Sequence, residues 1–199
     1  MIPSVKKSEI PFVRPINWLG LHRQYLNPGE MEILAGLLRD TLAESVLEFG
    51  CRDGRTARVL LHNVPQIQRY IGVDVSSDYA PALTHQLREM HPNPGYLASG
   101  DPRFRLVIHP RGSLDVQLGD FERVDVCFID GDHSEEVVEA DSYKALTLVR
   151  NDGMIIWHDL FNGAVGVSNA LNRLAAQGWP IKHIEGTWLA FRKVEPDAV

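Results

Sequence analysis

The chain has 199 residues, of which 44% are hydrophobic and 23% charged, as expected for one globular domain. With 20 basic and 26 acidic side chains the formal net charge is −6, so a nucleic acid is not an expected partner. No apolar run approaches the length of a membrane span, and no signal-peptide pattern follows the first residues. The two cysteines, Cys51 and Cys127, fall at predicted buried strands and suit reduced thiols. These features predict a soluble, cytoplasmic protein without a membrane partner.

Residues 1–26 lack clear periodicity, and we interpret them as an N-terminal arm packed on a domain of residues 27–194. A lid over the active site or a homodimer contact is the alternative for this arm. The first helix is expected to start with Asn27 as its cap, Pro28 at its first position and Glu30 in a capping box. Apolar side chains then recur at helical spacing: Met31, Leu34, Leu37, Leu38 and Leu42.

Strands and helices alternate through the rest of the chain. Buried strands are predicted over 45–49, 70–75, 104–109, 124–129 and 154–157, and helices near 57–64, 79–90, 134–149 and 167–178, with a turn at 151–153. The last two strands, 181–184 and 187–192, are separated only by Glu185 and Gly186 and must pair antiparallel. The predicted fold class is α/β, a doubly wound, mostly parallel seven-stranded sheet closed by an antiparallel C-terminal hairpin.

The first of these strands leads into the pattern Glu48-x-Gly50-x-x-x-Gly54. Glycines at such a turn allow close approach of the backbone to a ligand, and ligands of doubly wound sheets bind beyond the carboxyl ends of the strands. The dinucleotide fingerprint has a different glycine spacing and favours a phosphate, whereas a carboxylate before the first glycine suits an ammonium group. A tight turn without any ligand is the alternative.

Asp74 ends the second strand, 20 residues beyond Gly54. An acidic residue at this distance accepts hydrogen bonds from the ribose hydroxyls in nucleoside-binding α/β folds. The alternative role is a helix cap, although Ser76, Ser77 and Asp78 also offer one. Together with the glycine pattern, Asp74 favours a nucleoside cofactor.

Acidic and imidazole side chains follow two further strands, Asp130 and His133 after the fourth and His158 and Asp159 after the fifth. Neighbouring parallel strands end at the same edge, so these four groups are expected to meet there. Carboxylates that lie together repel each other unless a cation or a proton lies between them. A hard divalent cation, or an acid–base pair that uses His133, would relieve this repulsion.

The segments VLEFGCRDGRT, IGVDV, FIDGDHSEEVVEAD and DGMIIWHD resemble the class I S-adenosylmethionine-dependent methyltransferases. They are most similar to the small-molecule O-methyltransferase-like branch, the methyltransferase domain 24 group, over about Ser45 to Asp159. The resemblance implies that S-adenosylmethionine is the cofactor, with its methionine portion at the glycine pattern, its ribose at Asp74 and its adenine at Gly112 and Ser113. The implied cofactor-binding residues are Glu48, Gly50, Cys51, Arg52, Asp53, Gly54, Asp74, Val75, Gly112, Ser113 and Asp130.

Metal-dependent relatives bind Mg²⁺ through residues that correspond to Asp130 and Asp159, and usually carry Asp or Asn directly after the second one. This chain has Leu160 there, and Asn162 two positions on. The activity implied by the resemblance is O-methylation of a small hydroxylated acceptor, with Asp130, His133, His158 and Asp159 as catalytic residues.

Two alternative functions remain open. One is a metal-dependent hydrolase built on Asp130, Asp132, His133, His158 and Asp159, and the other is a cofactor-binding protein without transferase activity. Asp141 falls near the apolar stripe of its predicted helix, three residues after Val138, and a structural ion pair or a cap is expected for it.

Overall fold

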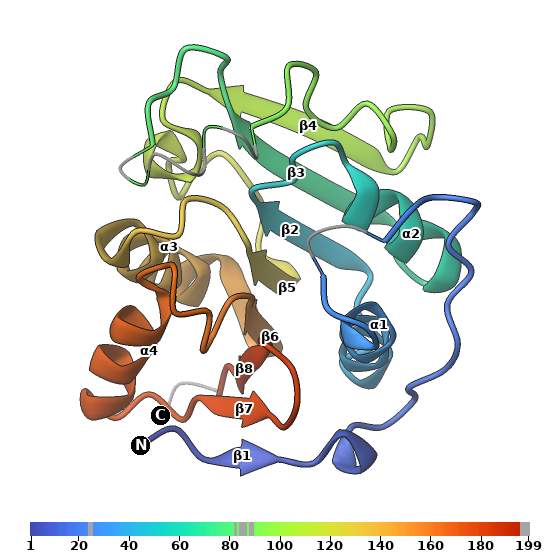
Figure 1. Ribbon diagram of the computed structural model, residues 1–199. Coiled ribbons are helices and arrows are strands. Elements are labelled where there is room, and N and C mark those ends of the chain that lie inside the picture. The colour runs from blue at the N-terminus through green and yellow to red at the C-terminus, as the bar shows by residue number, and fades with distance from the viewer. Residues whose placement is uncertain (24–25, 82, 84–86, 88–89, 196–199) are drawn as a thin grey trace.

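The computed structural model describes residues 1–23, 26–81, 83, 87 and 90–195. The strands of this part of the chain form an eight-stranded sheet in the order β1-β7-β8-β6-β5-β2-β3-β4 (Figure 1). The strands are β1 (Ser4–Val5), β2 (Ser45–Phe49), β3 (Arg69–Val75), β4 (Phe104–His109), β5 (Val124–Ile129), β6 (Val149–Trp157), β7 (Lys182–Ile184) and β8 (Ala190–Lys193). The α-helices are α1 (Glu30–Asp40), α2 (Arg55–Asn63), α3 (Glu135–Leu148) and α4 (Val167–Ala176). None of the helices described is long and apolar enough to cross a membrane.

The central strands are parallel, and the sheet is closed at one side by an antiparallel hairpin. Strand β2 pairs in parallel with β3 and β5, β5 pairs in parallel with β6, and β8 runs antiparallel to both β6 and β7. This confirms the predicted doubly wound sheet with its closing hairpin. The carboxyl ends of β2, β3, β5 and β6 therefore lie along one edge of the sheet.

The sheet has one strand more than the seven predicted. The additional strand, β1, belongs to the N-terminal arm and pairs in parallel with β7, Ser4 beside His183 and Val5 beside Ile184. Two residues are too few to show an alternating pattern, so no local pattern indicates this strand. Ile2 and Ile10, which flank it, are buried, and β1 lies at the edge of the sheet beside β7 (Figure 1).

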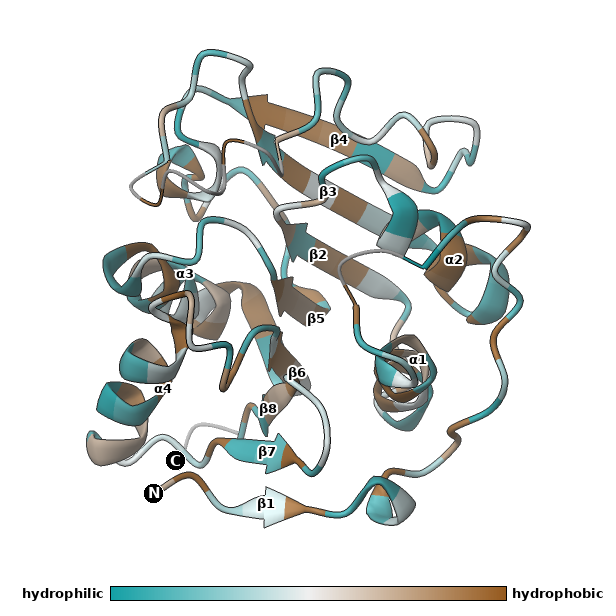
Figure 2. Ribbon diagram, in the orientation of Figure 1, coloured by the Kyte–Doolittle hydropathy of each residue, from teal (hydrophilic) through white to brown (hydrophobic). Residues whose placement is uncertain are grey.

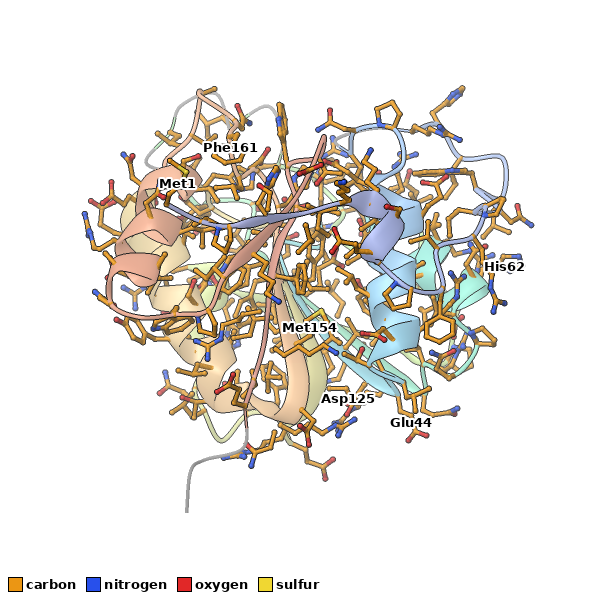
Figure 3. All side chains as sticks on the ribbon, turned by 90° about the horizontal axis from the view of Figure 1, so that it is seen from below. Met1, Glu44, His62, Asp125, Met154 and Phe161 are labelled. Carbon is orange, nitrogen blue, oxygen red and sulfur yellow. The ribbon has the colours of Figure 1, made fainter. Side chains whose placement is uncertain are left out.

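Helices cover both faces of the sheet, as Figure 3 shows edge-on. One apolar core lies between the sheet and α3 and α4, and includes Leu47, Phe49, Cys127, Ile129 and Trp157. The other lies between the sheet and α1 and α2, and includes Val46, Val126, Phe128, Met154 and Ile156. Successive residues of a strand point to opposite faces, so strands buried on both sides are mostly apolar, and much of the central sheet is brown in Figure 2. Both cysteines are free and buried, in agreement with the prediction.

Several predicted boundaries need correction. Helix α1 starts at Glu30, because Gly29 before it adopts a left-handed conformation with φ 88°. Leu42 lies beyond the end of α1 and is exposed, so it does not belong to the apolar stripe. The predicted turn at 151–153 lies within β6, where Asp152 has φ 64° and the pairing with β5 shifts its register.

The loop between β7 and β8 spans residues 185–189 and is longer than predicted. The predicted helix over 79–90 includes residues 82, 84–86 and 88–89, which lie outside the described part of the chain.

A buried acidic side chain, Asp125, also lies at the other end of the strands, near the start of β5, and its role there is structural. The carboxylate of Asp125 accepts hydrogen bonds from the backbone N–H groups of Glu44 and Ser45, both at 2.7 Å, and pairs with Arg150. Asp125 and Glu44 lie together in Figure 3, away from the carboxyl ends of the strands. Both oxygens of this carboxylate thus have partners within the chain.

Candidate functional site

A cavity of about 330 Å³ opens at the carboxyl ends of the parallel strands. Its wall is formed by the residues that follow β2, β3, β5 and β6, by a single 3-10 turn at Gly112–Asp115, and by the loop between β7 and β8. Strand β2 lies between β5 and β3, so the chain crosses to the other side of the sheet here, which is where doubly wound sheets bind ligands.

Most of the predicted cofactor-binding residues line this cavity. They are Gly50, Cys51, Arg52, Asp53, Asp74, Val75, Gly112, Ser113 and Asp130. Glu48 and Gly54 do not line it. The cavity thus brings together residues from four separate segments of the sequence.

The two motif glycines are required by the packing of the chain on itself. Gly50 has φ 86°, and a Cβ at this position would collide with the backbone of Asp130. Gly54 has φ 81°, and its Cβ would lie 2.9 Å from backbone atoms of Gly95. A residue with a Cβ is strained at these φ values and would also collide with the neighbouring backbone. Glycine is therefore favoured at both positions. The loop after β2 is thereby held close to the loop after β5.

Asp74 binds the loop after β2 from the end of β3. Its carboxylate accepts a hydrogen bond from the backbone N–H of Arg52 and, at 2.8 Å, one from the N–H of Val75. Burial raises the pKa of Asp74, and the two backbone hydrogen bonds oppose that rise. The Cys51 thiol is a third partner of this carboxylate, so about one of its four lone-pair sites remains for a ligand in the cavity.

Asp53 and Glu48 have partners within the protein instead. Asp53 forms an ion pair with Arg55 at 2.8 Å and is nearly buried. Glu48 is buried on the side of the sheet that faces α1 and α2, where Oε2 accepts a hydrogen bond from the Tyr70 hydroxyl at 3.0 Å. Burial raises the pKa of Glu48 well above its usual value, and the negative charges of nearby aspartates, first Asp130, add to the rise. Glu48 therefore lies beneath the cavity as a partner of Tyr70 and is not part of the cavity wall.

The four predicted acid–base residues meet at the far end of the cavity from Asp74. His133 Nε2 lies 3.2 Å from Asp159 Oδ2, and His158 Nδ1 lies 3.3 Å from Asp130 Oδ1 and 3.6 Å from Asp159 Oδ1. Their backbones are brought together because Ile129 and Trp157 are paired in neighbouring parallel strands. Asp159 has φ 62°, a left-handed conformation that is costly for a residue other than glycine and that often marks functional sites.

Glu30 is a member of this cluster that the sequence analysis assigned only to a capping box. It is completely buried, and its Oε2 lies 3.1 Å from His158 Nε2. Its carboxylate also accepts hydrogen bonds at 2.6 Å from the backbone N–H groups of Asn27 and Trp188, two residues that line the cavity. The signal in the sequence is that Glu30 lies four residues before Leu34, so a carboxylate falls on the apolar stripe of α1.

His158 is thus surrounded by three carboxylates. Burial lowers the pKa of His158, but the negative charge of Asp130 and the hydrogen bonds of the carboxylates outweigh this and raise it well above the usual value. Burial likewise raises the pKa of Asp159, and its contacts with His158 outweigh that and lower it. A positively charged imidazole therefore compensates part of the negative charge of Glu30, Asp130 and Asp159.

The magnesium ion implied by the resemblance does not fit these side chains well. Asp130, His133 and Asp159 offer ligand atoms within 4.8 Å of one another, but Mg²⁺ prefers an octahedron of oxygen ligands. Leu160, where relatives carry a further oxygen ligand, is wholly buried in the core. Asn162 instead donates a hydrogen bond to Asp159 Oδ1 at 3.0 Å. His158 provides the positive charge that a cation would otherwise bring.

Comparison with known proteins adds independent findings. The methyltransferase domain family matches residues 47–160, more than half of the chain. No curated protein matches the sequence. Cofactor-bound Rv0187 from MTB has a similar structure, with a TM-score of 0.61 and 21% identity over 89% of this chain and 85% of that one.

Two further solved structures are similar. The O-methyltransferase TomG from Streptomyces achromogenes, involved in tomaymycin synthesis and solved with SAM, has a TM-score of 0.59 and 17% identity over 89% of this chain and 85% of its own. An O-methyltransferase from Bacillus cereus in complex with SAH has a TM-score of 0.57 and 16% identity over 87% of this chain and 83% of its own. At these identities the likeness establishes the fold, that of the class I methyltransferases. With the family match over the motifs described above, the chain belongs to the methyltransferase domain family, and the predicted class of enzyme, an S-adenosylmethionine-dependent methyltransferase, is confirmed.

Proposed function

We propose that this protein transfers the methyl group of S-adenosylmethionine to a hydroxyl oxygen of a small acceptor molecule. The observation that carries the proposal is the continuity of the cavity. Asp74 and Ser113 line it at one end, and His133 and Asp159 line it at the other. A nucleoside and a reacting hydroxyl can therefore bind side by side, as methyl transfer requires.

The cofactor would lie along the loop after β2. Asp74 would accept a hydrogen bond from the ribose, and the 3-10 turn at Gly112 and Ser113 would form the wall beside the adenine. Gly50, Cys51 and Arg52 would lie along the methionine portion, with Glu48 beneath them. When bound, S-adenosylmethionine supplies an electrophilic methyl group on a sulfonium that leaves as a neutral thioether.

The acceptor would bind between the cofactor and the pair of His133 and Asp159. The attacking oxygen must lose its proton as it bonds to the methyl carbon, and a nearby imidazole can take that proton. Asp159 lies 3.2 Å from His133 Nε2, so a hydrogen at Nε2 is held there and Nδ1 keeps its lone pair for the proton. Alignment of the reacting atoms by the cavity supplies a further part of the acceleration.

A small molecule fits this site better than a nucleic acid does. The chain has a net charge of −6, and the far end of the cavity is rich in carboxylates. An extended phosphate backbone would be repelled by both. The hydroxylated acceptor is therefore proposed to be uncharged or cationic near its reacting oxygen.

Calorimetry with S-adenosylhomocysteine tests the cofactor half of the proposal. The wild type is expected to bind it, and Asp74→Ala to bind about 10- to 100-fold more weakly, because hydrogen bonds to a charged group are lost. Asp78→Ala is the matched control, since Asp78 is an exposed carboxylate four residues further on that does not line the cavity. Absence of binding to the wild type would contradict the proposal and favour a hydrolase.

A panel of small phenols, catechols and sugars, with release of S-adenosylhomocysteine as the readout, tests the transfer half. Product that carries a new O-methyl group is the expected result. Tight cofactor binding with no methylated product from any acceptor of this kind would contradict O-methyl transfer.

A further inference from the structure

Asp141 is a buried carboxyl group that the proposed methyl transfer does not use. It lies on α3 with no exposed surface, and its Oδ2 accepts a hydrogen bond from the Ser113 hydroxyl at 2.9 Å. None of the described residues donates a hydrogen bond to its Oδ1. Because Ser113 lines the cavity, Asp141 is separated from a ligand there by a single side chain.

A second residue of α3 holds the same segment. Lys144 Nζ donates hydrogen bonds to the backbone carbonyl of Ser113 and, at 2.7 Å, to that of Leu114. Ser113 is thus bound through its hydroxyl by Asp141 and through its carbonyl by Lys144. On its other side the turn packs closely against β3, since a Cβ on Gly112 would lie 2.8 Å from a methyl carbon of Val75. The position of this wall therefore depends on α3.

The strength of the contact between Asp141 and Ser113 changes near neutral pH. Burial raises the pKa of Asp141 to about 7, against the Ser113 hydrogen bond and the positive charge of Lys144. Asp132 raises it further, and Tyr79 and Cys127 are the other titratable groups that interact with Asp141. A hydrogen bond to a carboxylate is about twice as strong as one between neutral groups. Protonation of Asp141 therefore loosens its hold on Ser113.

We infer that Asp141 is a positioning residue that, through Ser113, holds the wall receiving the adenine ring, so that the protein binds its nucleoside cofactor more tightly when this carboxyl is ionised. The inference rests on the proposed function, because it requires S-adenosylmethionine or its product in the cavity. It assigns a role in cofactor affinity to a residue that makes no contact with the cofactor. It also explains why a carboxylate is buried on the apolar face of α3.

Calorimetry with S-adenosylhomocysteine from about pH 6 to pH 8 tests the inference. The wild type is expected to bind S-adenosylhomocysteine about fivefold more tightly at pH 8 than at pH 6. This factor is the difference between a hydrogen bond from Ser113 to a charged carboxylate and one to a neutral carboxyl group. Asp141→Asn is expected to bind weakly with no such gain. Glu136→Gln is the matched control, because Glu136 is an exposed carboxylate of the same helix that does not line the cavity. It should keep the wild-type pH dependence.

His91 and His133 also line the cavity, and both are present in every variant. The contribution of Asp141 is therefore the part of the pH dependence that Asp141→Asn lacks. Lys144→Met supplies a second test that leaves Asp141 in place. Loss of the positive charge raises the pKa of Asp141 further, so the gain in affinity should move to higher pH.

An unchanged gain in affinity in Asp141→Asn, or an unmoved midpoint in Lys144→Met, would overturn the inference while leaving the proposed function intact. Failure of the wild type to bind S-adenosylhomocysteine at any pH would instead refute the proposed function. Thermal unfolding of each variant separates these outcomes from a loss of folded protein. If Asp141→Asn does not fold, Lys144→Met alone decides the question.

Discussion

Glu30 and His158, 128 residues apart in the sequence, form a buried pair with 3.1 Å between Oε2 and Nε2. The pair joins the first turn of α1 to the end of β6. Since His158 also faces Asp130 and Asp159, one imidazole links the start of the domain to both carboxylates of the proposed acceptor site. Removal of His158 leaves the buried Glu30 carboxylate without its positive partner, and removal of Glu30 takes one of three carboxylates from His158.

Glu30→Gln is expected to lower the free energy of unfolding by roughly 1–3 kcal/mol, the range for a broken buried hydrogen bond to a charged group. Urea unfolding at neutral pH measures it. Asp40→Asn, at the other end of α1, is the control, because its pair with Lys193 lies at the surface and contributes about 1 kcal/mol or less. Equal losses in the two variants would show that the buried pair adds nothing.

The stabilisation by this pair should depend on pH in a defined direction. His158 has a raised pKa in the folded protein, against about 6.5 when unfolded. The stabilisation by charged His158 is therefore complete at pH values below its pKa in the unfolded chain. It is lost as the pH rises through the pKa of His158 in the folded protein. The difference in stability between wild type and Glu30→Gln should shrink in alkaline solution. A difference that grows with pH would contradict the assignment of His158 as a cation.

His133→Ala is expected to lower the rate of methyl transfer by about 10²- to 10⁴-fold, the usual contribution of a general base. Asp130→Ala is expected to abolish turnover, since it removes the carboxylate closest to His158 Nδ1. Both variants should bind S-adenosylhomocysteine nearly as the wild type does, because the loop after β2 and Asp74 are unchanged. Calorimetry measures cofactor binding and a turnover assay measures methyl transfer for each variant. Full activity of Asp130→Ala would contradict a catalytic role of Asp130.

Removal of divalent metal ions is expected to leave methyl transfer unchanged. His158 already places a positive charge beside Asp130 and Asp159, and Leu160 occupies the place of a further oxygen ligand. Turnover assayed after treatment with EDTA, with and without added Mg²⁺, is the measurement. Activity that disappears with EDTA and returns with Mg²⁺ would show that the two aspartates hold a cation.

Gly50→Ala is expected to cost at least about 1–3 kcal/mol of stability, because a left-handed φ at a residue other than glycine is strained and the new methyl group collides with the backbone of Asp130. Gly119→Ala is the matched control, since no atom lies within 4 Å of a Cβ there. Thermal unfolding compares the two. A stable Gly50→Ala would mean that the loops after β2 and β5 can move apart.

The sequence by itself determined the order of the elements, the parallel sheet with its hairpin and most of the cavity. These follow from local patterns, because burial on both faces makes the strands continuously apolar and because glycines mark the turns. The meeting of Asp130 with Asp159 could also be predicted, since neighbouring parallel strands end at one edge.

The tertiary structure alone decided the partners of individual side chains. Glu48 points away from the cavity because it shares a face of β2 with Val46, and one residue along a strand reverses the direction of a side chain. Trp188 reaches the site because Glu30, far away in the sequence, binds its backbone N–H. Ser113 and Asp141 meet because α3 packs against the turn after β4. Such contacts depend on how whole elements pack, and no local pattern encodes them.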